Sequence, residues 1–441
     1  MDTKELHELA ERHLVHHGLL SDIVPADQGP IFARAEGSLI WDTEGREYID
    51  FNSGQMCSAL GHNNLRVTRA ITEAATTLTH ASSVYYNVPQ VRLAARIAEI
   101  VDAPLSRSMF IQSGADSNEV AVLLARRYTG RSGIGAFHLG FHGYSDQTRA
   151  MSFCAAAPGY YGPSVPDIHA IPTPYAYRAE GAEGAEDGDE RWWRSLLQTG
   201  LELLDVQCPD NLAGVIVEPL VSAGGVIELP TGFLAALRDG VHARGGLLIL
   251  DEAQTGLAKL GTMFAYQQEG IVPDIMTLSK HFGGGMALSA VVTSDEIAAK
   301  ATASGLSFGH SHSSDPIACA AGVASIEEIV EEDLPAQAVA IGAYWRERVN
   351  DLQQRYPSIG DVRGRGTMQG IELVRDRASK EPASEEARAI VRAAILKGLL
   401  FSLRGPHWNV LRFVLPFTTT EPQIDRALGI IEDALRETAG D

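Results

Sequence analysis

The sequence predicts an α/β fold with a large domain around a mostly parallel central sheet and a smaller α/β domain formed by both termini. The chain has 441 residues, 45% of them hydrophobic, which is enough to bury at least one large core. From about residue 60 to 320, short β-rich runs alternate with helical patterns, as in a mostly parallel sheet. We therefore expect residues 1–60 and 326–441 to form the smaller domain and residues 61–325 the large one.

The first predicted elements are a helix from about residue 3 to 16 and a hairpin over residues 38–51, with its turn between Asp42 and Gly45. The central sheet follows. Its apolar runs are residues 133–137, 212–217, 247–250, 275–278 and 290–293.

The later elements are less regular. The Gly-, Ala- and acid-rich residues 178–190 predict an exposed loop. From about residue 325, a helix leads into a second region with strands at residues 368–374 and 410–416.

Composition and charge exclude several classes of function. The formal net charge of -20 argues against nucleic acid or an anionic membrane as a partner. Four cysteines without CxxC spacing indicate reduced thiols and no zinc site. The polar N-terminus lacks the apolar core of a signal peptide, and no apolar stretch is long enough to span a bilayer. We therefore expect a cytoplasmic protein.

Lys280 ends the apolar run of residues 274–279 and precedes a glycine-rich segment, residues 281–285. A lysine at the end of a buried strand has its ammonium where water is scarce, and desolvation favours the neutral amine. A neutral amine is a nucleophile toward carbonyl groups. The alternative interpretation is a lysine that extends from the strand end into solvent.

A second apolar run, residues 246–250, ends in the acids Asp251 and Glu252. Open α/β sheets bind ligands at the carboxyl ends of their strands, so an acid and an amine at two such ends define a candidate site. Pyridoxal phosphate chemistry uses this pair: a lysine forms a Schiff base with the cofactor aldehyde, and a buried carboxylate keeps the ring nitrogen protonated. Asp251 and Lys280 are the candidates. Asp251 could instead be the N-cap of a following helix.

A candidate phosphate site follows the short apolar run at residues 108–111. There, Ser113, Gly114 and Ala115 open a predicted helix. Gly114 lets the backbone approach closely, and the free amides of a helix start attract an anion. Ser113 and Asp116 could also form only a capping box.

In this order, the motifs resemble the class III branch of the fold-type I pyridoxal phosphate enzymes, over nearly the whole chain. Within that branch, the sequence is most similar to 2,2-dialkylglycine decarboxylase. The segments that carry the resemblance are residues 51–56, 114–119, 217–230, 249–256 and 364–366. The Asp-Glu-x-Gln strand end, with a lysine about one βα unit later, indicates the cofactor, and Ser-Gly-Gln-Met at residues 53–56 indicates the decarboxylase subgroup.

The resemblance implies roles around pyridoxal 5'-phosphate. Lys280 forms the Schiff base and shuttles the proton, Asp251 pairs with the pyridinium nitrogen, and Gln254 hydrogen-bonds the ring hydroxyl oxygen. Gly114 and Ala115 bind the phosphate through backbone amides. The further cofactor residues are Phe141, which stacks on the ring, His142, Gly143 and Ser311, which reaches the phosphate of the partner subunit.

The resemblance also implies a substrate side. Arg412 forks a substrate carboxylate, as a planar guanidinium does well. Gln55 contacts the group held perpendicular to the ring, where a carboxylate leaves as carbon dioxide and a hydrogen gives ordinary transamination. Ser222 and Phe141 complete this side.

Several of these residues have a structural alternative. Arg412 could form a structural ion pair, and Gln55 could be a surface loop residue. Ser311 could belong to a turn, and His142 and Gly143 could only end a strand.

An alkali cation, K⁺ or Na⁺, is a further implication of the resemblance, because hard cations prefer oxygen ligands. The matching positions are Ala81 (carbonyl), Ser83, Ser311, Ser313 (carbonyl) and Asp315. Asp315 could instead be a turn residue before a proline.

The sequence departs from the decarboxylase pattern near the substrate. Phe141 stands in place of a tryptophan, Gly309 in place of a tyrosine and Tyr144 in place of a methionine. Residues 401–408 differ from the family's loop and introduce Arg404, His407 and Trp408. These changes leave the cofactor motifs intact and indicate an altered substrate, larger or more anionic.

We therefore expect a pyridoxal phosphate enzyme that acts on an α-amino acid by decarboxylation-dependent transamination, with a keto acid as acceptor. The alternative is other carbanion chemistry on the same cofactor: plain transamination, elimination or carbon–carbon bond formation in a biosynthetic pathway. A binding protein without catalysis is disfavoured because Lys280, Asp251 and Gln254 occur together. The family pattern implies a homodimer or a dimer of dimers with shared active sites.

Overall fold

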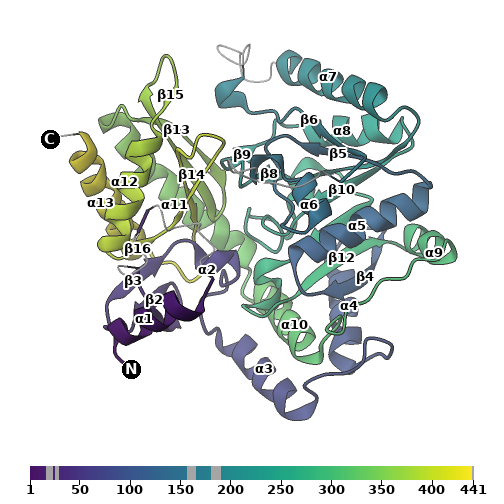
Figure 1. Cartoon of the computed structure of the whole chain (residues 1–441), viewed down its shortest axis with the longest axis horizontal. Coiled ribbons are helices and arrows are strands. Elements are labelled where there is room, and N and C mark those ends of the chain that lie inside the picture. Colours follow the sequence, from purple (N-terminus) through teal and green to yellow (C-terminus); the bar gives the residue numbers. More distant parts are fainter. Residues whose placement is uncertain (16–22, 25–28, 156–164, 180–189, 440–441) are drawn as a thin grey trace.

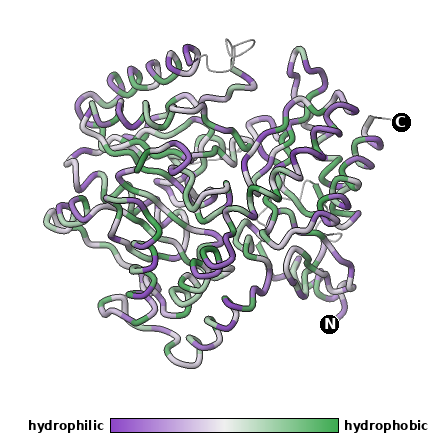
Figure 2. The backbone as a smooth tube through the Cα atoms, turned by 180° about the vertical axis from the view of Figure 1, so that it is seen from behind, coloured by the Kyte–Doolittle hydropathy of each residue, from purple (hydrophilic) through white to green (hydrophobic). Residues whose placement is uncertain are grey.

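The structure, a computed structural model, describes residues 1–15, 23–24, 29–155, 165–179 and 190–439. Figure 1 shows two lobes side by side, one built around a seven-stranded sheet and the other containing both ends of the chain. Figure 2 shows hydrophobic segments concentrated inside both lobes and hydrophilic segments in the outer helices and loops.

The seven-stranded sheet has the order β4-β12-β11-β10-β7-β5-β6. Its strands are β4 (Leu105–Ile111), β5 (Gly133–Phe137), β6 (Ile168–Ile171), β7 (Leu212–Val217), β10 (Leu247–Asp251), β11 (Ile275–Leu278) and β12 (Ser289–Ser294). The pairs from β6 to β11 are parallel, and β12 is antiparallel to β11 and β4. The prediction of a mostly parallel sheet is confirmed, and each of its five predicted runs is a strand.

Both faces of this sheet are buried, because alternate residues of each strand enter different hydrophobic clusters. In β10, Leu248 and Leu250 belong to one cluster, whereas Leu247 and Ile249 belong to the other. Helices of this lobe are α3 (Leu65–Thr77), α4 (Val88–Ile100), α5 (Gly114–Thr129), α6 (Asp146–Ala150), α7 (Arg191–Gln207), α8 (Phe233–His242), α9 (Asp295–Ala303) and α10 (Pro316–Glu331). Its smaller elements are η1 (Phe153–Ala155), η2 (Ala176–Arg178), β8 (Leu220–Val221), β9 (Ile227–Glu228), η3 (Ala265–Glu269) and η4 (Lys280–Gly283).

The second lobe brings the two ends of the chain together. Phe51 from the N-terminal part packs with Trp345 and Phe413, whose rings lie 4.6 Å apart. Its strands are β1 (Phe32–Glu36), β2 (Leu39–Asp42), β3 (Glu47–Asp50), β13 (Ile359–Arg365), β14 (Met368–Asp376), β15 (Glu381–Pro382), β16 (Leu399–Leu400), β17 (Ser402–Arg404) and β18 (Val410–Val414). Its helices are α1 (Thr3–His13), α2 (Ser53–Met56), α11 (Leu334–Arg355), α12 (Ser384–Leu396) and α13 (Glu421–Ala439). The predicted hairpin corresponds to the antiparallel strands β2 and β3.

The connection between the lobes begins earlier than expected. α10 begins at Pro316, not near residue 325, because proline is favoured in the first turn of a helix and Asp315 takes the N-cap position. In α11, Ala338 packs in the core of the larger lobe and Trp345 in the core of the second. The division into residues 1–60, 61–325 and 326–441 stays a prediction.

Some predicted features lie partly or wholly outside the described residues. The first helix ends at His13, and residue 16 is not among those described. Most of the loop expected over residues 178–190 also falls outside them. Across the described part of the chain, no helix is both long and apolar enough to cross a membrane.

Candidate active site

Lys280 lies at the carboxyl edge of the central sheet, directly after β11. β10 runs parallel to β11, and Asp251 at the end of β10 is in register with Thr277. Burial lowers the pKa of Lys280, and the charges of Cys57, Arg412, Asp251 and Glu218 also act on it. The strand ends therefore bring the predicted amine and acid to one place.

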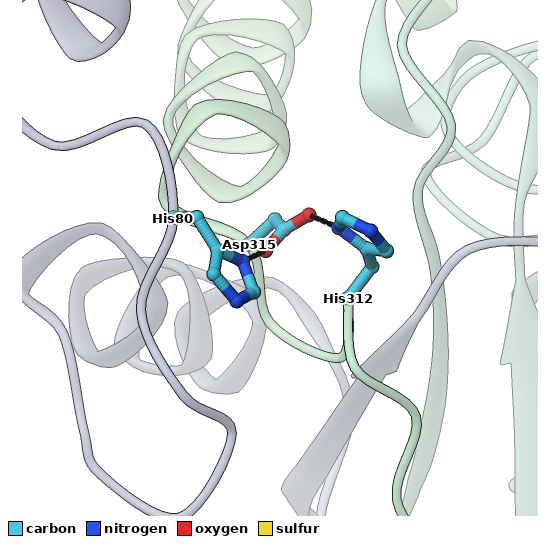
Figure 3. A group of neighbouring side chains, drawn as sticks. All are labelled: His80, His312 and Asp315. Atoms are coloured by element: carbon cyan, nitrogen blue, oxygen red, sulfur yellow. Dashed lines mark hydrogen bonds and ion pairs between the residues drawn. The ribbon is translucent and has the colours of Figure 1, made fainter.

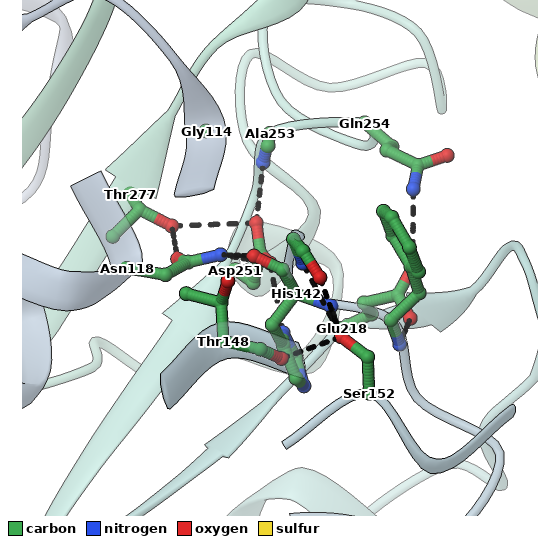
Figure 4. A network of polar contacts seen from close by, with 12 residues as sticks. Gly114, Asn118, His142, Thr148, Ser152, Glu218, Asp251, Ala253, Gln254 and Thr277 are labelled. Carbon is green, nitrogen blue, oxygen red and sulfur yellow. Dashed lines mark hydrogen bonds and ion pairs between the residues drawn. The ribbon is translucent and has the colours of Figure 1, made fainter. Parts of the chain in front are cut away.

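Asp251 is buried in a network that uses both of its carboxylate oxygens (Figure 4). Oδ2 accepts hydrogen bonds from Asn118 Nδ2 at 2.8 Å and from His142 Nδ1 at 2.9 Å. Oδ1 accepts from the backbone of Ala253 at 3.1 Å and from the hydroxyl of Thr277 at 3.3 Å. Turns follow Asp251, so the alternative of a helix N-cap does not apply.

The partners of Asp251 are themselves fixed. Asn118 Nδ2 also donates to the His142 carbonyl at 2.8 Å, and Asn118 Oδ1 accepts from Thr277 Oγ1 at 2.8 Å. The His142 backbone N–H donates to Ser152 Oγ at 2.7 Å. His142 Nε2 is buried and has no hydrogen-bond partner. β5 ends at Phe137, so His142 does not merely end a strand.

The predicted phosphate residues lie beside the lysine. Gly114 and Ala115 form the first turn of α5, where backbone N–H groups have no acceptor within the helix. A Cβ on Gly114 would lie 3.4 Å from Cβ of Ser279, next to Lys280. At Gly143, with φ of 140°, a Cβ would lie 2.6 Å from that of Ala115, so no side chain fits. The capping box of Ser113 and Asp116 is present as well.

Glu218, at the end of β7, is a central residue to which the sequence analysis gave no role. Its Oε1 accepts from the Phe141 backbone at 3.0 Å, and its Oε2 accepts from the Ser222 backbone at 3.2 Å. Gln254 Nε2 lies 3.5 Å from Oε2. Burial raises the pKa of Glu218 to about 7. Glu218 lies at the end of the strand next to that of Asp251, and this position at a strand end could have identified it from the sequence.

Arg412 is buried at the substrate side and pairs with no acid among the described residues. Its Nε donates to Ser402 Oγ at 3.0 Å and its Nη1 to Ser222 Oγ at 3.1 Å, while Gln254 Oε1 lies 3.5 Å from Nη1. Its Nη2 has no acceptor. Burial, together with the charge of Arg404, lowers the pKa of Arg412. The alternative of a structural ion pair is therefore not supported.

Gln55 is the predicted substrate residue whose side chain is exposed, whereas Ser222 and Arg412 are buried. It is exposed in a turn with irregular backbone angles, and its Oε1 accepts from Asn52 Nδ2 at 3.4 Å. The neighbouring Met56 carbonyl accepts from the buried Lys259 Nζ at 3.2 Å. Phe141, by contrast, is half-buried and packs edge-on against Tyr144, with ring centroids 5.1 Å apart.

Of the predicted cation residues, Asp315 lies in a second cluster, together with His80 and His312 (Figure 3). Both oxygens of Asp315 accept from imidazoles, Oδ1 from His80 Nδ1 at 2.7 Å and Oδ2 from His312 Nδ1 at 2.6 Å. The neighbouring Ser83 and Ser311 are exposed, and Ser313 Oγ accepts from the His310 backbone at 2.9 Å. Neither of the histidines bonded to Asp315, His80 and His312, was predicted as a site residue from the sequence.

The site around Lys280 fits pyridoxal phosphate. It offers an amine with a lowered pKa, a buried acid, free helix-start amides and two unpaired polar atoms, His142 Nε2 and Arg412 Nη2. The individual roles of these residues stay predictions.

Known proteins match this chain along nearly its whole length. The family model "Aminotransferase class-III" matches residues 24–435. An uncharacterised aminotransferase of Schizosaccharomyces pombe is 35% identical, over 98% of this chain and 94% of its own. Isoleucine 2-epimerase of Lentilactobacillus buchneri is 32% identical, over 92% and 89%. A solved structure, a thermostable (S)-enantioselective ω-transaminase from Thermomicrobium roseum, is 30% identical over 99% of each chain, with a TM-score of 0.92.

Proposed function

This chain belongs to the class-III aminotransferases, which use pyridoxal phosphate, and from that premise we propose that it transfers the amino group of an α-amino acid to a keto acid. The observation that carries the proposal is that Asp251 and Arg412, both buried, lie close enough to Lys280 for their charges to act on its amine. An amine, an acid and a guanidinium without an acid partner are the groups that an amino acid and this cofactor need.

When bound, pyridoxal phosphate supplies an aldehyde that bonds amines and a cationic ring that draws electrons from the substrate α-carbon. Asp251 would hold the proton at the ring nitrogen, and its orientation is fixed by Asn118 and His142. Lys280 would remove and return the proton at the α-carbon, because burial lowers the pKa of its amine.

Arg412 would bind the substrate carboxylate and so fix the α-carbon over the site. Its free Nη2 is the donor available for that contact, while Ser402 and Ser222 hold the other end of the fork. A bidentate pair with a carboxylate also removes the cost of a buried, unpaired cation. Binding of the substrate would thus supply the anion that Arg412 lacks among the described residues.

The decarboxylation-dependent course is a second candidate. The bond from Lys259 to Met56 favours it, because this bond anchors the turn of Gln55 beside the site. Release of carbon dioxide from 2-aminoisobutyrate, lost in Gln55→Ala, would support it. Transamination of alanine without release of gas from 2-aminoisobutyrate would leave plain transamination.

A K⁺ or Na⁺ ion at Asp315 is a separate part of the proposal. A Cβ on Gly309 would lie 3.9 Å from Ser83 Oγ, so the two segments that supply the expected oxygen ligands are neighbours. Each oxygen of Asp315 accepts one hydrogen bond from an imidazole and keeps a second lone pair with which it could bind an ion. K⁺ should then raise the Tm of the wild type but not that of Asp315→Asn. A rise with Zn²⁺ and none with K⁺ or Na⁺ would contradict the alkali ion, because imidazole nitrogen is a zinc ligand.

A homodimer, alone or within a dimer of dimers, is the proposed assembly. The side chains of Val84, Tyr85 and Tyr86 are 82%, 73% and 87% exposed, as expected of residues in a subunit interface. Ser311, which is close in sequence to Asp315, is exposed as well. Light scattering should give a dimer or tetramer for the wild type and a smaller species for Tyr86→Asp. A monomer that is fully active would contradict shared active sites.

The function is tested by two measurements on the cofactor-loaded protein. A panel of amino acids with pyruvate or 2-oxoglutarate should yield the corresponding new amino acid. Borohydride reduction and peptide mapping should place the cofactor on Lys280, and Lys259→Met serves as the matched control because Lys259 is also buried. A label on Lys259, or racemisation of the substrate without amino transfer, would refute the proposal.

A further inference from the structure

Two buried arginines lie on one face of the five-stranded sheet, with a glycine between them. Arg363 of β13 is directly opposite Gly370 of β14, and Gly370 is directly opposite Arg412 of β18. Opposite residues of antiparallel strands share a face, and neighbouring strands are about 4.8 Å apart, so the two arginines begin about 10 Å from each other. A Cβ on Gly370 would lie 3.0 Å from Cβ of Val226, so a segment of the larger lobe packs between the arginines.

That segment is the turn over residues 222–226, which joins β8 to β9, and both arginines bond it. The turn is closed by its last two N–H groups, which donate to the Ser222 carbonyl at 3.1 Å. At one end, Arg412 Nη1 donates to Ser222 Oγ. At the other end, Arg363 donates twice to the Gly225 carbonyl, from Nε at 2.9 Å and from Nη2 at 2.6 Å. Both lone pairs of that carbonyl are therefore used by one guanidinium.

The backbone of the turn is strained. Val226 has a φ of 58°, and a β-branched residue adopts this conformation only where its surroundings impose it. The two hydrogen bonds from Arg363 to the preceding residue are part of those surroundings. Their loss should let the turn relax.

Arg363 is neutralised by acids and held between the two lobes. Its Nη2 lies 2.7 Å from Glu372 Oε2, and its Nη1 lies 2.6 Å from Asp361 Oδ2. Two residues of the larger lobe fix Glu372 in turn: the Tyr175 hydroxyl donates to Oε2, and Arg178 Nε donates to Oε1 at 2.6 Å. A guanidinium paired in this way is rigid and does not need an anion from the substrate.

We propose that Arg363 is a positioning residue, which sets the substrate-binding conformation of Arg412 through the 222–226 turn. Arg363 fixes the Gly225 carbonyl, and the same turn carries Ser222. Ser222 holds Nη1 of Arg412, which leaves Nη2 free for the substrate carboxylate. The inference rests on the proposed function, because it concerns the binding of a carboxylate by the same site.

Binding of a simple carboxylate tests the proposal without catalysis. Calorimetry on the holoenzyme should show that Arg363→Gln weakens propionate binding roughly 10-fold, because Arg412 is retained but is no longer fixed. Arg363→Lys should restore part of the affinity. Arg346→Gln is the matched control, since Arg346 donates to the Val362 and Gly364 carbonyls on either side of Arg363 and not to the turn. Equal propionate affinity in the wild type and Arg363→Gln, or no binding by the wild type, would overturn the inference.

A double-mutant cycle tests the route through the turn. Arg363→Gln should weaken propionate binding in the wild type and change it less than about twofold in Ser222→Ala, where the link to Arg412 is already cut. Effects that simply add would give Arg363 only a structural role and overturn the inference. Tyr175→Phe is the milder variant if Arg363→Gln does not fold, because it removes only one hydroxyl bonded to Arg363. It should weaken propionate binding while Ser222 is present and not in Ser222→Ala.

Turnover separates the inference from the proposed function. KM for an amino acid should rise roughly 10-fold in Arg363→Gln while kcat changes less than about threefold, because the carboxylate is held in the ground state and in the transition state alike. A lower kcat with an unchanged KM would overturn the inference and leave the proposed function intact. No amino transfer by the wild type with any substrate would refute the function itself, and propionate binding would still decide the role of Arg363.

Discussion

Histidine Nδ1 donates to aspartate in two regions of this molecule, and the two settings differ in burial. His142 and Asp251 are 0% and 5% exposed, at 2.9 Å. His80, His312 and Asp315 are 48%, 66% and 21% exposed, at 2.7 and 2.6 Å. The exposed contacts are the shorter ones. The two regions therefore differ in the solvent exposure of their side chains and not in the length of the histidine–aspartate hydrogen bond.

Burial changes what each aspartate can do. Asp251 accepts hydrogen bonds from Asn118, Thr277 and the backbone of Ala253, so its carboxylate is held in one orientation. Because the group is buried, water screens its charge poorly. Asp315 has the two imidazoles, and water competes for both. The same pair of residue types thus suits catalysis in one region and loop attachment in the other.

The largest expected effect is that of Asp251→Asn. This isosteric change removes the buried charge that would keep the ring nitrogen protonated. We expect kcat/KM to fall roughly 10²- to 10³-fold, equivalent to about 3–4 kcal/mol. Steady-state kinetics at saturating cofactor would measure it.

The matched control is Asp315→Asn, the same atomic change in the exposed region. It should alter kcat/KM by less than about fivefold, since exposed ion pairs contribute about 0–1 kcal/mol. Comparable losses in the two variants would break the comparison and show that burial is not what separates the two regions.

Lys259 shows the effect of burial without any acid. It is fully buried, its Nζ donates to the Met56 carbonyl, and burial lowers its pKa from 10.5 to about 7. Between pH 7 and 10.5 the unfolded chain binds a proton that the folded chain does not, so the free energy of unfolding rises with pH by up to about 1.4 kcal/mol per unit.

Lys259→Met lacks this dependence. The Tm of the wild type minus that of the variant should therefore increase from pH 7 to pH 9, as scanning calorimetry would show. A difference that stays constant with pH would mean that the amine titrates in the folded protein as it does in the unfolded one.

Much of the fold and the core of the site could be predicted because local patterns carry them. The alternation of strand and helix patterns predicted the sheet. Positions at the ends of two parallel strands predicted Asp251 and Lys280 as site residues. Glu218 carried the same strand-end signal, but a carboxylate there without a matching partner had no assigned role. The partners of Asp251 could not be found this way, since Asn118 and His142 are 133 and 109 residues away in sequence.

Asn118→Ala tests how much the shell of Asp251 contributes. It removes two hydrogen bonds donated by the Asn118 amide and one accepted from Thr277. Buried groups left unpaired cost about 1–3 kcal/mol, so kcat/KM should fall roughly 5- to 100-fold, less than in Asp251→Asn. Asn64→Ala is the control: Asn64 caps α3 and bonds Glu328, so its loss should lower the Tm and leave kcat/KM unchanged. Unchanged kinetics in Asn118→Ala would mean that the function of Asp251 does not depend on its hydrogen bond from Asn118.

The smallest expected effect is that of Asp315→Asn on stability. In a single chain, the cluster of His80, His312 and Asp315 is exposed to water, so the variant should lose less than about 1 kcal/mol of unfolding free energy. This loss should become smaller as NaCl is raised from 0.05 to 1 M, because salt screens exposed charges. The proposed second subunit changes this expectation, since it would cover the apolar residues from Val84 to Tyr86 and exclude water nearby. If the dimer instead buries Asp315 as Asp251 is buried, the free energy of unfolding would fall by several kcal/mol in Asp315→Asn, independently of salt and only at protein concentrations where the dimer forms. Urea unfolding at two protein concentrations and two salt concentrations separates these outcomes, because the contrast between the two aspartates then depends on the assembly and not on the single chain.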